Sequence, residues 1–151
     1  VASPDFAFPS NDGMEGLSAA PDGWRTAGES GGLWDCTPAG CHTVVAPPEP
    51  LLGDADYRMT GLDRDPSGDG WFVVQRRFQA PTDVRARVRH MAADGTLGPV
   101  LVELKHPGTV DNFEGIAAVA TVGGVRLYLL SDDNFSEKQR TLLLAFDLTR
   151  P

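Results

Sequence analysis

Six polar side chains form three pairs, and each pair is placed symmetrically about a predicted turn. The pairs are Glu15 with Glu29, Thr60 with Arg76, and Glu114 with Asp132. Their midpoints are Asp22, Gly68 and Gly123, each within a run of turn-forming residues. Side chains equidistant from the turn of an antiparallel hairpin face each other at about 5 Å between Cβ atoms. We therefore expect each pair to meet at the open end of a hairpin, and the six side chains to surround one mouth of a channel.

Carboxylates held this close repel each other, which raises a pKa or attracts a cation. Calcium takes oxygen ligands, so the sequence predicts a calcium site formed by Glu114, Asp132 and Asp133. The other predicted ligand-binding residues are Glu15, Glu29, Thr60, Arg76, Arg77 and Asn134. Arg76 and Arg77 are suited either to pairing with the acids or to holding a phosphate through bidentate contacts. The alternative is that the whole set forms only salt bridges and hydrogen bonds between repeated units.

The elements that must position these residues are strands. Residues 84–91 and 141–148 alternate in character with a period of two, which is typical of β-strands. Turn-forming runs recur at 21–23, 66–70, 94–95 and 123–124, whereas helix signals are nearly absent. The chain is therefore predicted to be all-β.

A motif of apolar, polar, glycine and aliphatic residues occurs three times. Its copies are Met14-Glu15-Gly16-Leu17, Met59-Thr60-Gly61-Leu62 and Phe113-Glu114-Gly115-Ile116. Each copy opens a hairpin that further strands follow, which is the pattern of a four-stranded propeller blade. We predict blades at about 11–50, 55–105 and 110–151, with residues 1–8 as a strand that completes the third. Three blades cannot close a ring, so the chain is either a fragment of a larger propeller or pairs with a second copy.

The two cysteines, Cys36 and Cys41, are separated by a segment that contains Pro38 and Gly40, which favour a tight reversal. We predict a disulfide across a hairpin, and hence an oxidising compartment. A pair of free thiols is the alternative, and two cysteines alone cannot complete a zinc site.

Three further motifs have simpler interpretations. GESGG at 28–32 matches the nucleophile-elbow pattern, but that motif requires a helix where a strand is expected here. DRDPSG at 63–68 resembles the start of a calcium loop, yet Val74 stands where that loop needs a glutamate. Arg85, Arg87 and Arg89 alternate along one strand, which predicts the solvent face of an outer strand, with anion binding as the alternative.

The composition argues against a nucleic-acid partner and against a membrane span. The 151 residues include 13 Lys and Arg against 21 Asp and Glu, a formal net charge of −8. Because nucleic-acid affinity comes largely from basic residues that neutralise phosphates, no nucleic acid partner is predicted. No apolar run approaches the roughly 18 residues of a membrane span, so none is predicted.

Two regions of the chain resemble a known family. DNFEGIA at 111–117, RLYLLSDDNF at 126–135 and QRTLLLAF at 139–146 are similar to the C-terminal signature of the phytase-like β-propeller family, described as having esterase-like activity of phytase. YRMTGL at 57–62 and FVVQRRF at 72–78 resemble its penultimate blade. The resemblance covers about residues 14–148 and implies a bacterial, exported (periplasmic or secreted) propeller of about six blades, of which this chain holds the last three.

The same resemblance implies an ester hydrolase. Its substrate would be a phosphoric or related ester, with metal or arginines at the mouth stabilising negative charge while water attacks. The alternative is a non-catalytic exported propeller that binds a small ligand or a protein partner at the same mouth. The remaining blades of the ring, or a second copy, are the other expected partners.

Overall fold

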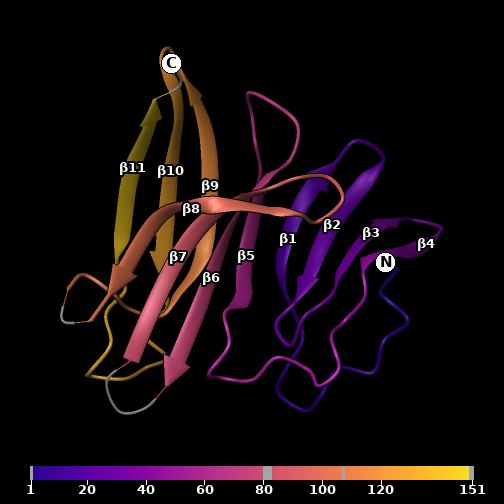
Figure 1. Cartoon of the computed structure of the whole chain (residues 1–151), viewed down its shortest axis with the longest axis horizontal. Helices are drawn as coiled ribbons and strands as arrows, with labels where there is room; N and C mark the ends of the chain where they lie inside the picture. The colour runs from indigo at the N-terminus through magenta and orange to yellow at the C-terminus, as the bar shows by residue number, and fades with distance from the viewer. Residues whose placement is uncertain (1, 80–82, 107, 150–151) are drawn as a thin grey trace.

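The computed structural model describes residues 2–79, 83–106 and 108–149, which form eleven strands and no helix. The strands make three antiparallel sheets in chain order (Figure 1). The first sheet contains β1 (Met14–Ala20), β2 (Gly23–Gly28), β3 (Leu33–Thr37) and β4 (Gly40–Val45). The second sheet contains β5 (Arg58–Arg64), β6 (Trp71–Gln79), β7 (Asp83–Met91) and β8 (Leu97–Lys105). The third sheet contains β9 (Phe113–Thr121), β10 (Gly124–Ser131) and β11 (Leu143–Thr149).

The all-β prediction is confirmed, but the third sheet has three strands rather than four among the described residues. Residues 2–8 form no strand there, and Val1 lies outside the described residues. Instead, the rings of Phe6 and Phe8 lie 5.8 Å and 5.7 Å from the ring of Trp34 in the first sheet. Aromatic packing thus holds this segment against the first sheet, and the prediction that it completes the third is not met.

The first strands of the three sheets, β1, β5 and β9, lie side by side. A glycine permits each close approach. A Cβ atom at Gly16 would lie 2.2 Å from a side-chain atom of Leu62, and one at Gly61 would lie 2.4 Å from the backbone oxygen of Glu114. The repeated glycine of the sequence motif is therefore required where one inner strand crosses the next.

Two hydrophobic cores hold the sheets together, one on each face of the second sheet. Alternate residues of β6 pack into the two cores. Val73 belongs to the core shared with the first sheet, and Val74 belongs to the core shared with the third. Arg25 reinforces the first of these interfaces, because its guanidinium carbon lies 3.8 Å from the centre of the Trp71 ring. Asp35 neutralises that buried arginine through two hydrogen bonds, of 2.6 Å and 2.7 Å.

The disulfide between Cys36 and Cys41 is confirmed, and it joins cross-strand partners of β3 and β4. No helix of the described residues could cross a membrane.

Candidate functional site

Each inner hairpin contains a β-bulge at the polar residue of the repeated motif. The pairing register of β1 with β2 shifts at Glu15, that of β5 with β6 at Thr60, and that of β9 with β10 at Glu114. A bulge leaves one residue unpaired and redirects its side chain. The three motif residues therefore occupy one equivalent position in the three sheets, at the open ends of the hairpins.

The bulges change the partners that the symmetric spacing predicted. Arg76 lies opposite Arg58 rather than Thr60. The backbone N–H of Glu29 donates to Gly13, and that of Asp132 donates to Asn112. Every predicted pair is thus displaced by two residues. The turn shifts the pairing register by one residue, and the bulge shifts it by one more. The predicted residues remain at the same end of the hairpins, but none of the three pairs is a direct cross-strand pair.

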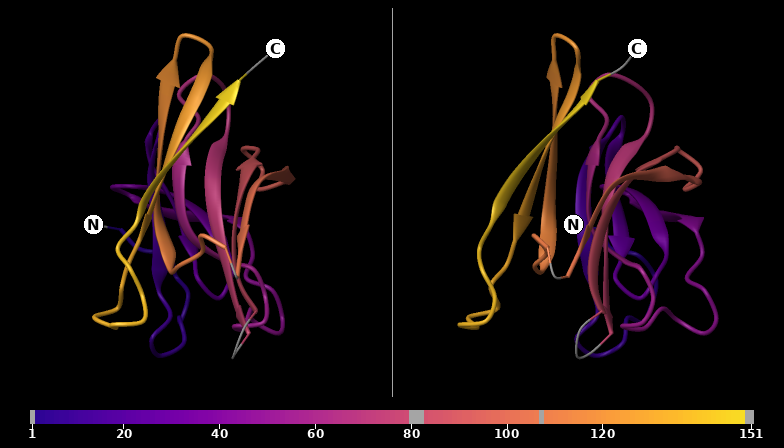
Figure 2. Two further views of the ribbon diagram at one scale, coloured as in Figure 1. Left: turned by 90° about the vertical axis from the view of Figure 1, so that its left-hand side faces the viewer. Right: turned by 60° about the vertical axis from the view of Figure 1, so that its left-hand side comes forward.

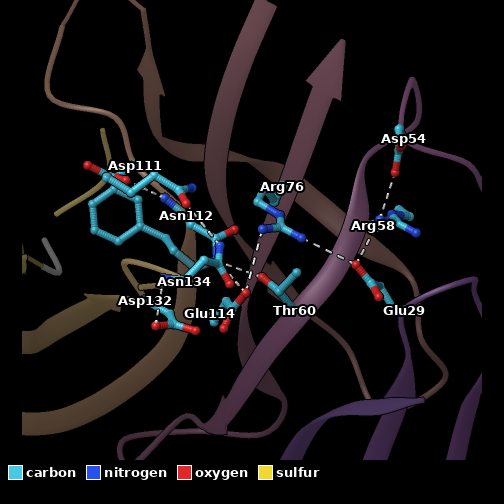
Figure 3. Close-up of polar contacts among 12 residues, drawn as sticks. Glu29, Asp54, Arg58, Thr60, Arg76, Asp111, Asn112, Glu114, Asp132 and Asn134 are labelled. Carbon is cyan, nitrogen blue, oxygen red and sulfur yellow. Dashed lines mark hydrogen bonds and ion pairs between the residues drawn. The ribbon is translucent and has the colours of Figure 1, made fainter. Parts of the chain in front are cut away.

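A chain of ion pairs crosses all three sheets at this end (Figure 3). Glu29 Oε1 lies 2.8 Å from a guanidinium nitrogen of Arg58 and 3.3 Å from one of Arg76. Arg76 also lies 3.5 Å from Glu114 Oε1, which accepts a 2.6 Å hydrogen bond from Asn112 Nδ2. We call Glu15, Glu29, Arg58, Arg76, Asn112 and Glu114 the mouth network.

Carboxylates outnumber guanidinium groups in this region. Arg58 additionally contacts Asp54 at 2.9 Å and Asp12 at 3.6 Å. The pKa of Glu15 is raised above its usual value because its carboxyl loses solvation and lies near Glu29 and Glu114, and the nearby Arg76 opposes this rise. The surplus of carboxylates therefore favours retention of a proton on Glu15, while Arg58 and Arg76 pair with Glu29 and Glu114.

The hydroxyl group of Thr60 is used in a contact between sheets and is not open to solvent. It is 1% exposed, and its hydroxyl donates a 2.9 Å hydrogen bond to the backbone oxygen of Phe113 in the third sheet. Arg77 lies on the opposite face of β6 from Arg76 and contacts Asp83 at 3.6 Å. Neither residue contributes a free side chain to the mouth network.

The predicted calcium ligands are engaged in local turns. Asp132 Oδ1 accepts the backbone N–H of Asn134, and Asp133 accepts hydrogen bonds from the backbone of Phe135 and the hydroxyl of Thr141. Within residues 2–79, 83–106 and 108–149, no three His, Cys, Asp or Glu side chains are grouped closely enough to hold a metal ion. Calcium therefore stays a prediction, and no step below uses it.

A cleft of about 930 Å³ opens beside the mouth network, between the second and third sheets. Four cationic side chains line it: Arg58, Arg76, Lys138 and Arg140. Its other polar lining comes from Asp54, His106, Asp111, Asn112, Asn134, Ser136 and Gln139. Arg140 is fixed by Asp111, whose Oδ2 lies 3.2 Å from Arg140 Nε. The cleft can accommodate a small molecule that carries an anionic group.

Sequence reasoning identified Arg76 and Asn134 but missed other lining residues of this cleft. Arg58 was missed because it lies opposite Arg76 only through the bulge at Thr60, which the alternation of residues does not reveal. Lys138 and Arg140 lie in the segment between β10 and β11, where no repeat or regular spacing distinguishes them. Ser30 of the GESGG motif is fully buried in the turn between β2 and β3, so it is not placed as an accessible nucleophile.

The chain belongs to the phytase-like family, described as esterase-like activity of phytase, because the family model matches residues 1–135. That match spans the first two sheets and the β9–β10 hairpin. No curated protein and no solved structure matched the chain. Family membership and the disulfide are both consistent with an extracellular protein.

Proposed function

We propose that this chain binds the anionic group of a phosphoric or related ester in the cleft between the second and third sheets, and that the protein hydrolyses the ester. The observation that carries the proposal is the convergence of Arg58, Arg76, Lys138 and Arg140 on one cleft in a member of the phytase-like family. Guanidinium groups bind tetrahedral oxyanions through paired N–H donors and stabilise the charge that develops during attack.

Glu114 lies beside the cleft and is the general base that we propose, because the two carboxylates that line the cleft, Asp54 and Asp111, are paired with Arg58 and Arg140. It contacts Arg76 and Asn112, and both of these residues line the cleft. In the proposed reaction, water attacks the phosphorus or acyl carbon while Glu114 takes its proton. The bond between the phosphorus or acyl carbon and the ester oxygen breaks, and Glu114 returns the proton to the leaving oxygen, so that the alcohol leaves neutral and the base is regenerated. Arg76 holds both Glu114 and the substrate in this arrangement.

A non-catalytic ligand-binding propeller is the second candidate. The observation that favours it is that Arg58 and Arg76 are already neutralised by carboxylates, so they are suited to fixing the sheets as well as to binding substrate. The test is an assay of the chain against phosphate monoesters and carboxylate esters, with and without calcium. We expect the chain to release product, and Glu114→Gln should lower kcat. Saturable binding of the esters without turnover would overturn hydrolysis in favour of the second candidate.

We further propose that the three sheets are blades of a propeller ring, in a periplasmic or secreted protein, completed by further blades or by a second copy. The outer face of the third sheet is uncovered by the described chain (Figure 2) and exposes Leu130 and Leu143 at 48% and 67%. Gly115 is equivalent to Gly16 and Gly61, the glycines against which the next inner strand packs in the first two sheets. Sedimentation of the 151-residue chain tests the second copy: a dimer supports closure by that copy, and a strict monomer rules it out.

A further inference from the structure

A row of three basic side chains crosses the second sheet away from the cleft. Arg77 on β6 is the cross-strand partner of Arg85 on β7, and Arg85 is the partner of Lys105 on β8. We call these three residues the basic row. Directly opposed side chains lie about 5 Å apart at their Cβ atoms, and like charges placed so destabilise a sheet. The row lies near the end of β6, the beginning of β7 and the end of β8, strands that Figure 1 labels.

The described residues supply too little negative charge to neutralise the basic row. Asp83 alone contacts it among the ion pairs of the described chain, at 2.5 Å from Arg85 and 3.6 Å from Arg77. The next cross-strand row places Arg87 opposite Glu103 and so adds no net charge. The pKa of Arg87 is lowered because burial and the nearby Arg89 disfavour its charged form, an effect that Glu103 opposes. A surplus of positive charge therefore remains on this part of the sheet.

The surrounding contacts also hold the cations in position. The guanidinium of Arg87 lies 3.5 Å from the centre of the Tyr57 ring, and its Nε donates a 2.9 Å hydrogen bond to Gln75. Arg77 Nε is buried without an acceptor among the described residues. Arg77 also donates a 2.8 Å hydrogen bond to Gln79, so the contacts within the sheet use only some of its donors. The remaining guanidinium donors of Arg77 and Arg85 are suited to an oxyanion, because they match its geometry.

We propose that the basic row binds a phosphate-type dianion at a site separate from the cleft. Arg77 and Arg76 follow one another on β6 and so lie on opposite faces of the second sheet. The basic row is on the face shared with Val73, whereas the cleft is on the face of Arg76. Arg85 and Arg77 donate to the anion, and Lys105 supplies the third charge. The anion is either free inorganic phosphate or the phosphate of a lipid headgroup.

The test follows the side-chain Nε–Hε signals of ¹⁵N-labelled arginines while inorganic phosphate is added. We expect saturable shifts at Arg77 and Arg85. Lys105→Gln should raise the Kd for phosphate about fivefold or more, as expected for one lost contact to a charged group. Arg126→Gln is the matched control, because it makes the same charge change on the third sheet, and it should leave the Kd unchanged.

Three results would overturn the proposal: no saturable shift at Arg77 and Arg85, equal weakening by both substitutions, or shifts confined to the arginines of the cleft. Arg85→Gln gives a second variant of the same row, and thermal unfolding verifies that each variant is folded. Co-sedimentation with phosphatidylcholine vesicles containing phosphatidic acid distinguishes the sources. Binding that Lys105→Gln abolishes assigns the lipid headgroup, and phosphate binding without vesicle binding assigns the free ion.

Discussion

Arg76 is the residue on which the three sheets depend most at the open end of the hairpins. It contacts Glu29 of the first sheet and Glu114 of the third from its place on β6. Because Glu29 is 8% exposed, removal of a cation beside it leaves a carboxylate with little access to water. Charge and packing are therefore coupled at this one side chain.

Arg76→Gln should destabilise the protein by about 1–3 kcal/mol at pH 7, because buried hydrogen bonds to charged groups contribute about this much. Urea denaturation at pH 7 measures this loss, with Arg126→Gln as the control, because Arg126 pairs with Asp147 at an exposed site. An equal loss for both variants would show that the burial of the carboxylates does not carry the effect.

Glu15 makes the stability of the folded protein depend on pH. Because its pKa is raised in the folded state, the folded protein binds more protons than the unfolded chain just above the usual glutamate pKa. This contribution to stability is present at low pH and is lost as the pH rises through the raised pKa. Glu15→Gln should therefore stabilise the protein at pH 7, by less than about 1 kcal/mol for a screened group, and should give no gain at pH 4. Thermal unfolding across this range tests the sign.

Among the elements, β5 and β9 depend on a glycine for their close approach. Gly61→Ala would place a methyl group 2.4 Å from the backbone oxygen of Glu114. Such overpacking against backbone should cost about 1–3 kcal/mol. Gly123→Ala is the matched control, because a Cβ there meets no atom within 4 Å. Chemical denaturation of both variants measures the difference, and equal stabilities would contradict the required approach.

The disulfide strengthens one hairpin at the edge of the first sheet. Cys36 and Cys41 are five residues apart, so the loop-entropy model assigns the bond about 2 kcal/mol, less than a long-range link. Mild reduction should lower the free energy of unfolding by about that amount without unfolding the protein at room temperature. An intact mass unchanged by reduction would contradict the bond itself.

Hairpins and their turns could be predicted from the sequence because alternation and turn residues are local signals. Register could not, because a bulge at Glu15, Thr60 or Glu114 leaves no mark beyond the glycine that follows it. Because the bulges were not predicted, the three pairs were assigned the wrong partners and Arg58 was missed. The cleft was beyond sequence reasoning for a different reason: Arg140 and Lys138 reach it from an irregular segment whose path depends on the packing of two sheets.

At the scale of the whole molecule, the charge is unevenly distributed. The chain carries a net charge of −8, yet four basic side chains converge on the cleft and three more form the basic row. An acidic protein that gathers cations in one cleft attracts small anions there while it disfavours polyanions over its surface as a whole. This distribution agrees with a small anionic ester as the ligand of the phytase-like member proposed above.

The most direct measurement of that claim is a map of where a phosphate monoester analogue binds. Phenylphosphonate cannot be hydrolysed as an ester, so it can be added to ¹⁵N-labelled protein to saturation. We expect shifts in the side-chain amide signals of Asn112, Asn134 and Gln139, which line the cleft, and none in the indole signal of Trp34 in the first sheet. Unchanged signals from the three cleft amides at saturation would contradict the proposed site.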